Sequence, residues 1–472
     1  MNPEAAPAGM AALLPADIAY PLSCDIGTWS IEDGHVIYVI DCQRSILNHK
    51  WTIRRRYNEF AALNRELAPY GMDFGLPPKK TFGNLKPDFV RARKVALQEF
   101  IDKVTVHPLL FCNEAVLNFL EAPAIPDKNE ENQVAATHIR NFRDLVITKR
   151  WEENGWRYCK LFYQVISQST KNMYVYTWLP YGRIRPTQPG NLIVIFEFLR
   201  KLKFPYFLSP EKVMADRHGI GLLTEMKPRG SLRDRLFGKR PEGSFWEKYN
   251  VQNEIVPLAD DEAREVAKDV LEGLIALQKL GVPYTSIHCG NVYVTENGSR
   301  LSEIEQCITN QNTMHYPSMI KNKYVNTIDN MMVINFGHFV YEMLTGIMVF
   351  PEHDAITALS RLPRDWQYFL QRIFVPDKKY GLPSLCGLAN DPLFENITPF
   401  VRDCYLSAPL VAKALLETIR QKYTQRFHAD KAAFNERRRI DHFQELIQSD
   451  AERNRRRELV LAQLRNNSDN TK

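Results

Sequence analysis

Three consecutive arginines end at Arg56 and are followed directly by Tyr57. Guanidinium groups bind phosphate through paired hydrogen bonds, and the face of a tyrosine ring can lie against the C–H side of a sugar ring. Two further basic stretches follow: Lys79 and Lys80 after two prolines, and Arg93 within a stretch of helical apolar spacing. The arginines alone would be read as an exposed basic strand end. The three stretches together favour a pocket for a phosphorylated ring.

The elements that must position these side chains follow from the apolar spacing of the first 125 residues. Alternating apolar and polar side chains predict three strands, at residues 17–24, 34–42 and 50–56, with a turn at 32–34. Helical spacing predicts three helices, at residues 58–67, 88–106 and 113–120. The basic and aromatic stretch therefore lies where the third strand ends and the first helix begins, and Arg93 lies early in the second helix.

Three motifs occur in this region in order: R-Y-x-x-F, which starts at Arg56, then L-P-x-K, then F-x-x-x-R-x-x-x-L. Together they resemble the PX (phox-homology) domain over roughly residues 16–124. The resemblance implies these ligand contacts: Arg56 with the 3-phosphate of an inositol ring, Tyr57 under that ring, Lys79 with the 1-phosphate, and Arg93 with the 4- and 5-hydroxyls.

The same resemblance implies phosphatidylinositol 3-phosphate as the ligand and endosomal membranes as the location. The residues themselves indicate only a headgroup with at least one ring phosphate. Lys80 is the alternative to Lys79 if the register of the Pro-rich loop shifts by one. Phe60 is expected in the core. Met72, Phe74 and Phe82 flank the loop, and they either enter the bilayer or are buried loop residues.

Residues from about 136 follow a second pattern, with strands first and helices later. The spacing predicts strands at 156–166, 173–179 and 219–226, helices at 191–203 and 260–280, and a hairpin over 291–304. Four segments resemble protein kinases in order and spacing: the hinge and the helix after it (222–236), the helix before the catalytic loop (272–281), the central helix (336–346) and the closing segment (391–394). The resemblance covers roughly residues 136–400 and implies a two-lobed fold.

The positions that carry chemistry in kinases are altered in this sequence. The catalytic-loop pattern H-R-D-L-x-x-x-N aligns with residues 284–291, so Ser286 replaces the catalytic Asp while Asn291 stays a candidate magnesium ligand. The D-F-G segment aligns with Glu303 and the two residues after it; a Glu can bind magnesium, but its longer stem moves the carboxylate. His288 is either a substitute base or, as its position favours, a structural residue.

Other kinase features are missing from the sequence. A glycine-rich loop is not found, because Gly155 is the only glycine between residues 136 and 181, and the strand at 173–179 contains no lysine. Ile195 stands where the glutamate partner of that lysine is expected, with Glu197 nearby if the register shifts. Met332 replaces the aspartate that braces the catalytic loop. We therefore predict a pseudokinase with no catalytic residue, no metal and no cofactor.

The composition of the 472-residue chain narrows the class further. It is 44% hydrophobic and 25% charged, the balance of a globular protein, and its net charge of +6 is too small to indicate a nucleic-acid partner. Its eight cysteines form no CxxC pair, which favours reduced thiols over a disulfide framework. Because neither a basic signal segment nor a membrane-spanning run is predicted, we expect a cytoplasmic protein with peripheral membrane contact.

From about residue 410 the sequence is helical and charged, with basic clusters at 437–439 and 455–457 beside a narrow apolar stripe. Two interpretations stay open. This tail is either a solvated helix that packs lightly on the preceding domain, or a partner-binding or coiled-coil segment.

A PX domain before a degenerate kinase-like domain resembles the PX domain-containing kinase-like protein family (MONaKA-type), over roughly residues 16–425. The resemblance implies endosomal binding, trafficking of receptors or ion pumps, and sodium/potassium-ATPase subunits as partners. The predicted fold is α+β and multidomain: a PX domain with a three-stranded sheet plus helices, a two-lobed kinase-like fold and a charged helical tail. Its predicted parts are a disordered N-terminus (1–15), the PX domain (16–124), a linker (125–135), the kinase-like domain (136–425) and a basic helical tail (426–472).

Two functions of different class fit this organisation. The first is a membrane-recruited scaffold, in which the PX domain binds a 3-phosphoinositide and the pseudokinase presents a protein-binding surface. The alternative is a PX-localised serine/threonine kinase with residual activity, which would use Asn291 and Glu303 for magnesium.

Overall fold

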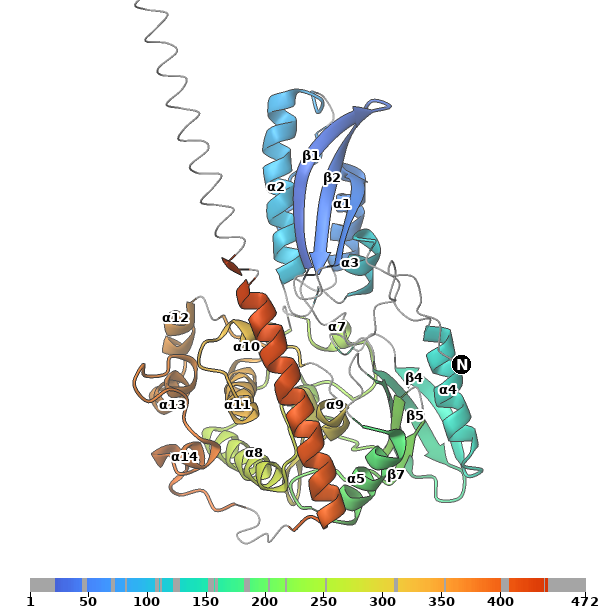
Figure 1. The fold of residues 1–472 in the computed structure, drawn as a ribbon, viewed down its shortest axis with the longest axis vertical. Helices are drawn as coiled ribbons and strands as arrows, with labels where there is room; N and C mark the ends of the chain where they lie inside the picture. The colour runs from blue at the N-terminus through green and yellow to red at the C-terminus, as the bar shows by residue number, and fades with distance from the viewer. Residues whose placement is uncertain are drawn as a thin grey trace, which may run out of the picture.

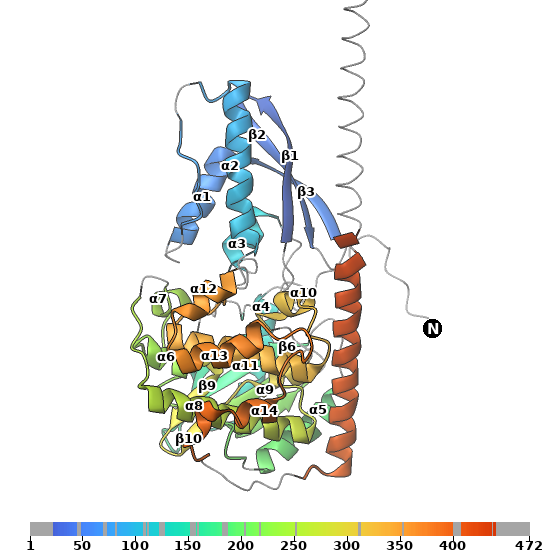
Figure 2. The same ribbon diagram turned by 90° about the vertical axis from the view of Figure 1, so that its left-hand side faces the viewer.

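The computed structural model of the chain is shown from two directions in Figures 1 and 2. It describes residues 22–44, 49–68, 73–80, 83–106, 110, 113–121, 128–151, 157, 160–181, 187–202, 204–216, 219–250, 253–309, 313–351, 354–399, 407–436 and 438–439. The first region stands above a larger two-lobed region, and a long C-terminal helix runs along the side of that second region (Figure 2). The predicted disordered N-terminus and both basic clusters of the tail, except residues 438 and 439, lie outside the described residues.

The N-terminal sheet is an antiparallel meander of β1 (Leu22–Glu32), β2 (His35–Arg44) and β3 (His49–Arg56). The predicted turn at 32–34 is confirmed, since Asp33 and Gly34 have φ of 47° and 73°, the left-handed values that a tight hairpin turn requires. The first strand was predicted to end at residue 24, but it continues to Glu32. A bulge between Ile26 and Thr28 shifts the pairing with β2, so the alternation that marks a strand is interrupted there.

Three helices cover this sheet: α1 (Tyr57–Leu67), α2 (Pro87–Val106) and α3 (Glu114–Phe119), close to their predicted bounds. The core between them is aromatic. Phe60 is fully buried, as expected, with its ring centroid 6.2 Å from that of Phe100 and 5.0 Å from that of Phe119. Phe74 is also buried and packs on Phe100, so it is a buried loop residue; Met72 and Phe82 lie outside the described residues.

The second region begins with α4 (Lys128–Arg140), which occupies most of the predicted linker. A five-stranded antiparallel sheet follows, made of β4 (Leu145–Trp151), β5 (Leu161–Ser167), β6 (Met173–Pro180), β7 (Lys212–Ala215) and β8 (Gly219–Glu225) in the order β4-β5-β6-β8-β7, with α5 (Pro189–Lys201) after β6. The sequence did not predict β4 or β7. A bulge between Ile147 and Lys149 breaks the alternation of β4, and β7 has only four residues.

Helix α4 covers the outer face of this sheet. Its Ala135 and Ile139 are buried in a separate hydrophobic cluster with residues of β5, β6 and β8, among them Tyr163 and Trp178. His138 of the same helix contacts the Tyr176 hydroxyl at 2.9 Å through Nδ1 and Asp216 at 3.1 Å through Nε2. The segment predicted as a linker or helix start is therefore part of the packing of the small lobe.

The large lobe is built around two helices, α8 (Asp260–Leu280), which has its predicted bounds, and α11 (Ile328–Thr345), which is buried almost throughout. The predicted hairpin is confirmed as β9 (Val292–Thr295) and β10 (Gly298–Leu301). The remaining elements are α6 (Leu232–Leu236), α7 (Phe245–Lys248), η3 (Cys289–Asn291), α9 (Ile304–Ile308), α10 (Tyr316–Lys321), α12 (Ala355–Ser360), α13 (Arg364–Phe374), α14 (Leu385–Ala389) and η5 (Pro392–Phe394).

The C-terminal helix covers residues 410–436 and crosses the predicted boundary at 425/426 without a break. Its side chains Leu416, Ile419, Tyr423 and Phe427 are buried, and the Tyr423 hydroxyl lies 2.8 Å from that of Thr285 in the large lobe. Up to residue 436 this helix is therefore an integral part of the second region rather than a solvated helix. Among the helices that the structure describes, none combines the length and apolar character needed to cross a membrane.

Candidate functional sites

The first site lies where β3 ends and α1 begins, and its centre is a stacked guanidinium. The Arg93 guanidinium carbon is 4.3 Å from the centroid of the Tyr57 ring and 4.3 Å from that of Phe89. Arg93 is only 7% exposed, and its Nη2 donates a hydrogen bond to the Pro78 carbonyl at 3.0 Å. Such stacking fixes the plane of the guanidinium and so orients its remaining N–H groups.

The Pro-rich loop is tied to the same place. The Tyr57 hydroxyl donates to the Pro77 carbonyl at 2.6 Å, and burial raises the pKa of this tyrosine against the opposing charge of Arg93. The loop thus delivers Lys79, which is exposed and forms no ion pair with the residues described, beside the Arg93 stack. The neighbouring Lys80 Nζ lies 4.4 Å from the Phe89 ring centroid.

The three consecutive arginines have three different environments. Arg54 pairs with Glu32 of the neighbouring hairpin. Arg55 is largely buried; it pairs with Glu121 at 2.7 Å and donates to the Phe119 carbonyl at 2.8 Å. Arg56 alone is exposed and makes no ion pair within the described part of the chain. The structure therefore brings together the four side chains predicted from the sequence and assigns the other two arginines to the fold.

This site lies at the far end of the N-terminal region. In the sheet Arg56 pairs with Ile37, close to the β1–β2 turn. That turn points away from the second region in both views, whereas α3 lies at the opposite end, next to the second region (Figures 1 and 2). A flat surface that met this end of the molecule would therefore meet the basic side chains before the larger lobes.

The second site is the cleft between the two lobes. It is lined by β5, β6, β8 and α5 on one side and by residues of α6, α7, η3 and the segment after β10 on the other. Val175 and Thr177 are the β6 residues that face it. The cavity has a volume of about 100 Å³, small beside the roughly 300–1,000 Å³ of typical ligand sites.

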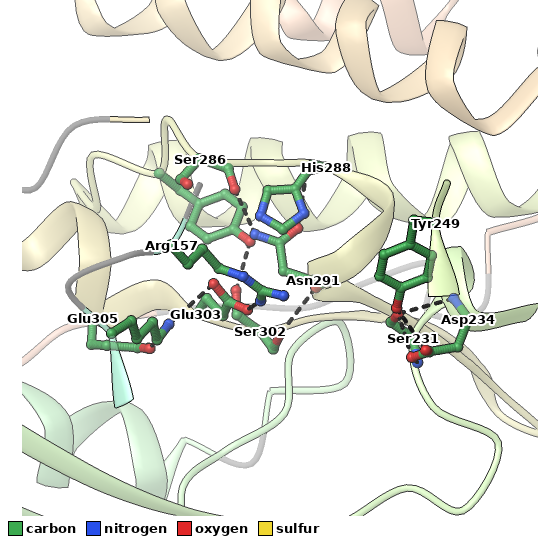
Figure 3. Close-up of polar contacts among 12 residues, drawn as sticks. Arg157, Ser231, Asp234, Tyr249, Ser286, His288, Asn291, Ser302, Glu303 and Glu305 are labelled. Carbon is green, nitrogen blue, oxygen red and sulfur yellow. Dashed lines mark hydrogen bonds and ion pairs between the residues drawn. The ribbon is translucent and has the colours of Figure 1, made fainter. Parts of the chain in front are cut away.

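Two cations that the sequence did not predict pair with carboxylates of this cleft: Arg157, which lines it, and the buried Lys160. Arg157 pairs with Glu303, and Lys160 pairs with Glu303 at 3.0 Å and also with Glu305. Figure 3 shows Arg157 reaching across to Glu303. Burial raises the pKa of Glu303, but the charges and hydrogen bonds of the two cations outweigh it and hold that pKa below its ordinary value. Glu303 is therefore an ionised carboxylate whose charge is already compensated.

The loop before β9 is held by its own amide and carbonyl groups. Asn291 is fully buried: its Nδ2 donates to the Ser286 carbonyl, and its Oδ1 accepts from the His288 N–H at 3.0 Å (Figure 3). Ser286 and His288 are 1% and 2% exposed, and burial lowers the pKa of the histidine far below its usual value. A buried neutral imidazole of this kind fits the structural interpretation of His288, not a base that exchanges protons with a substrate.

Helix α11 braces this loop, through residues other than the expected one. Met332, predicted to stand in place of the bracing aspartate, is buried and apolar, and Asn335 one turn later donates from Nδ2 to the Thr285 carbonyl. Glu342 accepts the Cys289 N–H at 3.0 Å and pairs with the fully buried Arg233 of α6. In the sequence, Asn335 and Glu342 are polar residues at helical spacing within a helix that is otherwise largely apolar, and this pattern could have predicted the brace.

The chain is similar to known proteins in both of its regions. The family model described as PX domain matches residues 43–123. The "PX domain-containing protein kinase-like protein" of Mus musculus is 24% identical over 409 residues, which is 84% of this chain and 68% of the mouse protein. "Probable inactive serine/threonine-protein kinase slob1" of Dictyostelium discoideum is 24% identical over 266 residues, 50% of this chain and 43% of that protein. Human "Sorting nexin-8" is 38% identical over 86 residues, 18% of this chain and 17% of that protein.

The chain carries a PX domain followed by a kinase-like region. The PX domain contains the first site, and the cleft lies between the lobes of the kinase-like region. The sequence predicts that Ser286, Asn291 and Glu303 of that region align with the catalytic loop and the D-F-G segment. The structure gathers all three near the cleft (Figure 3). The described residues contain no group of three or more metal-ligating side chains arranged for an ion.

Neither candidate for the glutamate partner of a phosphate-anchoring lysine serves that role. Ile195 is fully buried and apolar, and Glu197 pairs with Arg200 of its own helix at 2.6 Å. The lysine that pairs with carboxylates of the cleft, Lys160, directly precedes β5. The expected motif position in β6 does not point to Lys160, because the tertiary structure and not a sequence motif places this lysine beside Glu303 and Glu305.

Proposed function

We propose that this protein is a peripheral membrane scaffold, in which the PX domain binds a phosphoinositide and the kinase-like region binds proteins without transferring phosphate. The observation that carries the proposal is the contrast within the arginine triplet. Arg56 is left exposed and without an ion pair next to the stacked Arg93, while its two neighbours are used by the fold. An unpaired arginine beside an oriented guanidinium is suited to bidentate phosphate binding.

In this proposal the ligand is phosphatidylinositol 3-phosphate, following the PX resemblance. Arg56 binds the 3-phosphate, Lys79 the 1-phosphate and Arg93 the 4- and 5-hydroxyls, while Tyr57 lies under the ring. The exposed ends of Arg56 and Lys79 support these roles, as does the fixed plane of Arg93. Binding would place the chain on endosomal membranes from the cytoplasmic side.

The proposal assigns no phosphoryl transfer to the kinase-like region. A serine hydroxyl at position 286 cannot accept a proton usefully at neutral pH, and Glu303 is already compensated by Arg157 and Lys160. The name of the Dictyostelium relative, a probable inactive kinase, agrees with this. No observation favours the alternative, a PX-localised serine/threonine kinase that would hold magnesium on Asn291 and Glu303.

Partner binding is the second half of the proposal. By family resemblance the partners are receptor cargo or sodium/potassium-ATPase subunits, and the role is their trafficking or regulation. The similarity of the PX domain to a sorting nexin supports a role in membrane sorting. No nucleic-acid partner is proposed.

The lipid half is tested with liposomes that contain phosphatidylinositol 3-phosphate. Arg56→Ala removes a charge-assisted phosphate contact and should weaken binding by about 1–3 kcal/mol. Arg65→Ala, an exposed arginine at the other end of α1, is the matched control and should bind as the parent does. If a folded Arg56→Ala variant bound these liposomes as well as the parent chain does, the assignment of the phosphoinositide site to these residues would be wrong.

The partner half is tested in the same variants by affinity capture from cytosol and by a phosphorylation assay. The Arg56→Ala chain should lose endosomal localisation yet capture the same proteins in solution as the parent chain. Purified protein should phosphorylate generic substrates no more than a mock preparation does. Activity that disappears in Glu303→Ala would instead favour the residual kinase.

A further inference from the structure

A kinase-like cleft implies a nucleotide and magnesium, and the residues present do not fit either of them. In such folds the carboxylate at the position of Glu303 holds the metal, which neutralises the phosphates. Here that carboxylate faces Arg157 and Lys160, and its second neighbour Glu305 also pairs with Lys160. A metal ion at Glu303 would have to displace two cations that belong to the protein.

Backbone and ring contacts hold both cations in place beside these carboxylates. The Lys160 N–H donates to the Arg157 carbonyl at 2.9 Å, so the two side chains leave one backbone turn. The Arg157 guanidinium carbon and the Lys160 Nζ lie 5.1 and 5.3 Å from the centroid of the Phe162 ring, which lines the cleft. Rings and backbone therefore orient both positive groups toward the same carboxylates.

The carboxylates are equally fixed. Glu303 has a φ of 61°, a left-handed value unusual for a residue with a side chain, and α9 begins at the residue after it. The side chains of all four groups are between 2% and 14% exposed, and their charges sum to zero. Removing any one of the four would leave the cluster with one uncompensated buried charge.

The two pairs of groups also come from different lobes. Arg157 and Lys160 precede β5 of the small lobe, whereas Glu303 and Glu305 follow β10 next to the large lobe. The ion pairs thus span the cleft whose small volume was noted above. Closure of the two lobes around this cluster needs no nucleotide.

We propose that Arg157 and Lys160 are a built-in substitute for magnesium: they neutralise the D-F-G carboxylate and hold the lobes closed without nucleotide. The inference rests on the proposed function, which requires only that phosphoryl transfer is absent. It adds a physical reason why the cleft does not bind the metal that this transfer needs. It makes the kinase-like region a constitutively closed platform whose protein-binding surface does not depend on nucleotide.

The test uses the full chain and Mn²⁺, measured directly by electron paramagnetic resonance, together with thermal unfolding with and without Mg²⁺ and ADP. The parent chain should bind no Mn²⁺ and show no rise in Tm. The double substitution Arg157→Ala/Lys160→Ala leaves Glu303 and Glu305 without counterions. It should bind Mn²⁺ and gain a Mg²⁺-dependent rise in Tm of about 5 °C at a hundredfold excess over Kd.

The matched control is Lys149→Ala/Lys201→Ala, which removes two exposed charges from the same lobe and should leave Mn²⁺ binding absent. If the double alanine variant fails to fold, Arg157→Gln/Lys160→Gln keeps hydrogen-bonding side chains without their charge and should still acquire weaker Mn²⁺ binding. Mn²⁺ bound by the parent chain, or none bound by a folded chain that lacks both cations, would overturn the inference while leaving the scaffold function intact. Phosphorylation activity in the parent chain would instead overturn the proposed function.

Discussion

The PX site and the kinase-like cleft both contain an arginine and a lysine, but the two pairs of cations are in opposite environments. In the PX domain, Arg56 and Lys79 are exposed and make no ion pair with the described residues. In the cleft, Arg157 and Lys160 are buried and paired with carboxylates of the same chain. The comparison teaches that a basic residue is available to a ligand only where the fold has not already satisfied its charge.

The largest expected effect separates the two regions by pH. Burial lowers the pKa of His288 and of His315 far below the usual histidine value, and lowers that of His338 to about 3. The unfolded chain therefore binds more protons than the folded chain as pH falls below about 6.5, so stability is present above that pH and is lost below it. At pH 5 each histidine should cost up to about 2 kcal/mol.

Urea unfolding of the full chain at pH 7.5, 6.5 and 5 checks this, with separate signals for the two regions. The unfolding transition of the kinase-like region should move to lower urea concentration as pH falls. Its free energy of unfolding should drop by up to about 6 kcal/mol for the three histidines together. All three buried histidines belong to the kinase-like region, so the transition of the PX domain should move less over the same pH interval. Equal acid sensitivity of both regions would contradict the comparison.

The next largest effect concerns the buried pair that braces the loop before β9. Glu342→Ala leaves Arg233 buried without a counterion and removes the acceptor of the Cys289 N–H, so the kinase-like region should lose about 3–5 kcal/mol of unfolding free energy. Arg54→Ala breaks the exposed pair with Glu32 in the PX domain and serves as the contrast. It should leave the urea midpoint unchanged, because exposed pairs are screened by solvent.

The smallest effect sharpens the PX side of the comparison. Arg93→Lys keeps the positive charge but loses the planar group that stacks between Tyr57 and Phe89, so liposome binding should weaken roughly 5- to 30-fold. Arg91→Lys, at an exposed arginine of the same helix, should bind like the parent. If both variants bound equally well, charge alone and not the oriented guanidinium would account for the affinity.

The sequence by itself determined the PX motifs and the order of the kinase-like segments. Local pattern is sufficient there, because the motif residues lie at the ends of elements that their own spacing predicts, such as Arg56 between β3 and α1 and the long helix α8. The alignment that puts Ser286 at the position of the catalytic aspartate likewise comes from the sequence and stays a prediction. The roles of single residues within the PX site stay predictions.

Only the tertiary structure decided which charges are free. The R-Y-x-x-F motif singles out Arg56, but the triplet does not show that Arg55 is paired within the fold, since its partners Phe119 and Glu121 are more than 60 residues away. Likewise Arg157 and Lys160 meet Glu303 only because the two lobes close on each other. Ion pairing is set by distance and burial in space, and a linear sequence carries neither quantity.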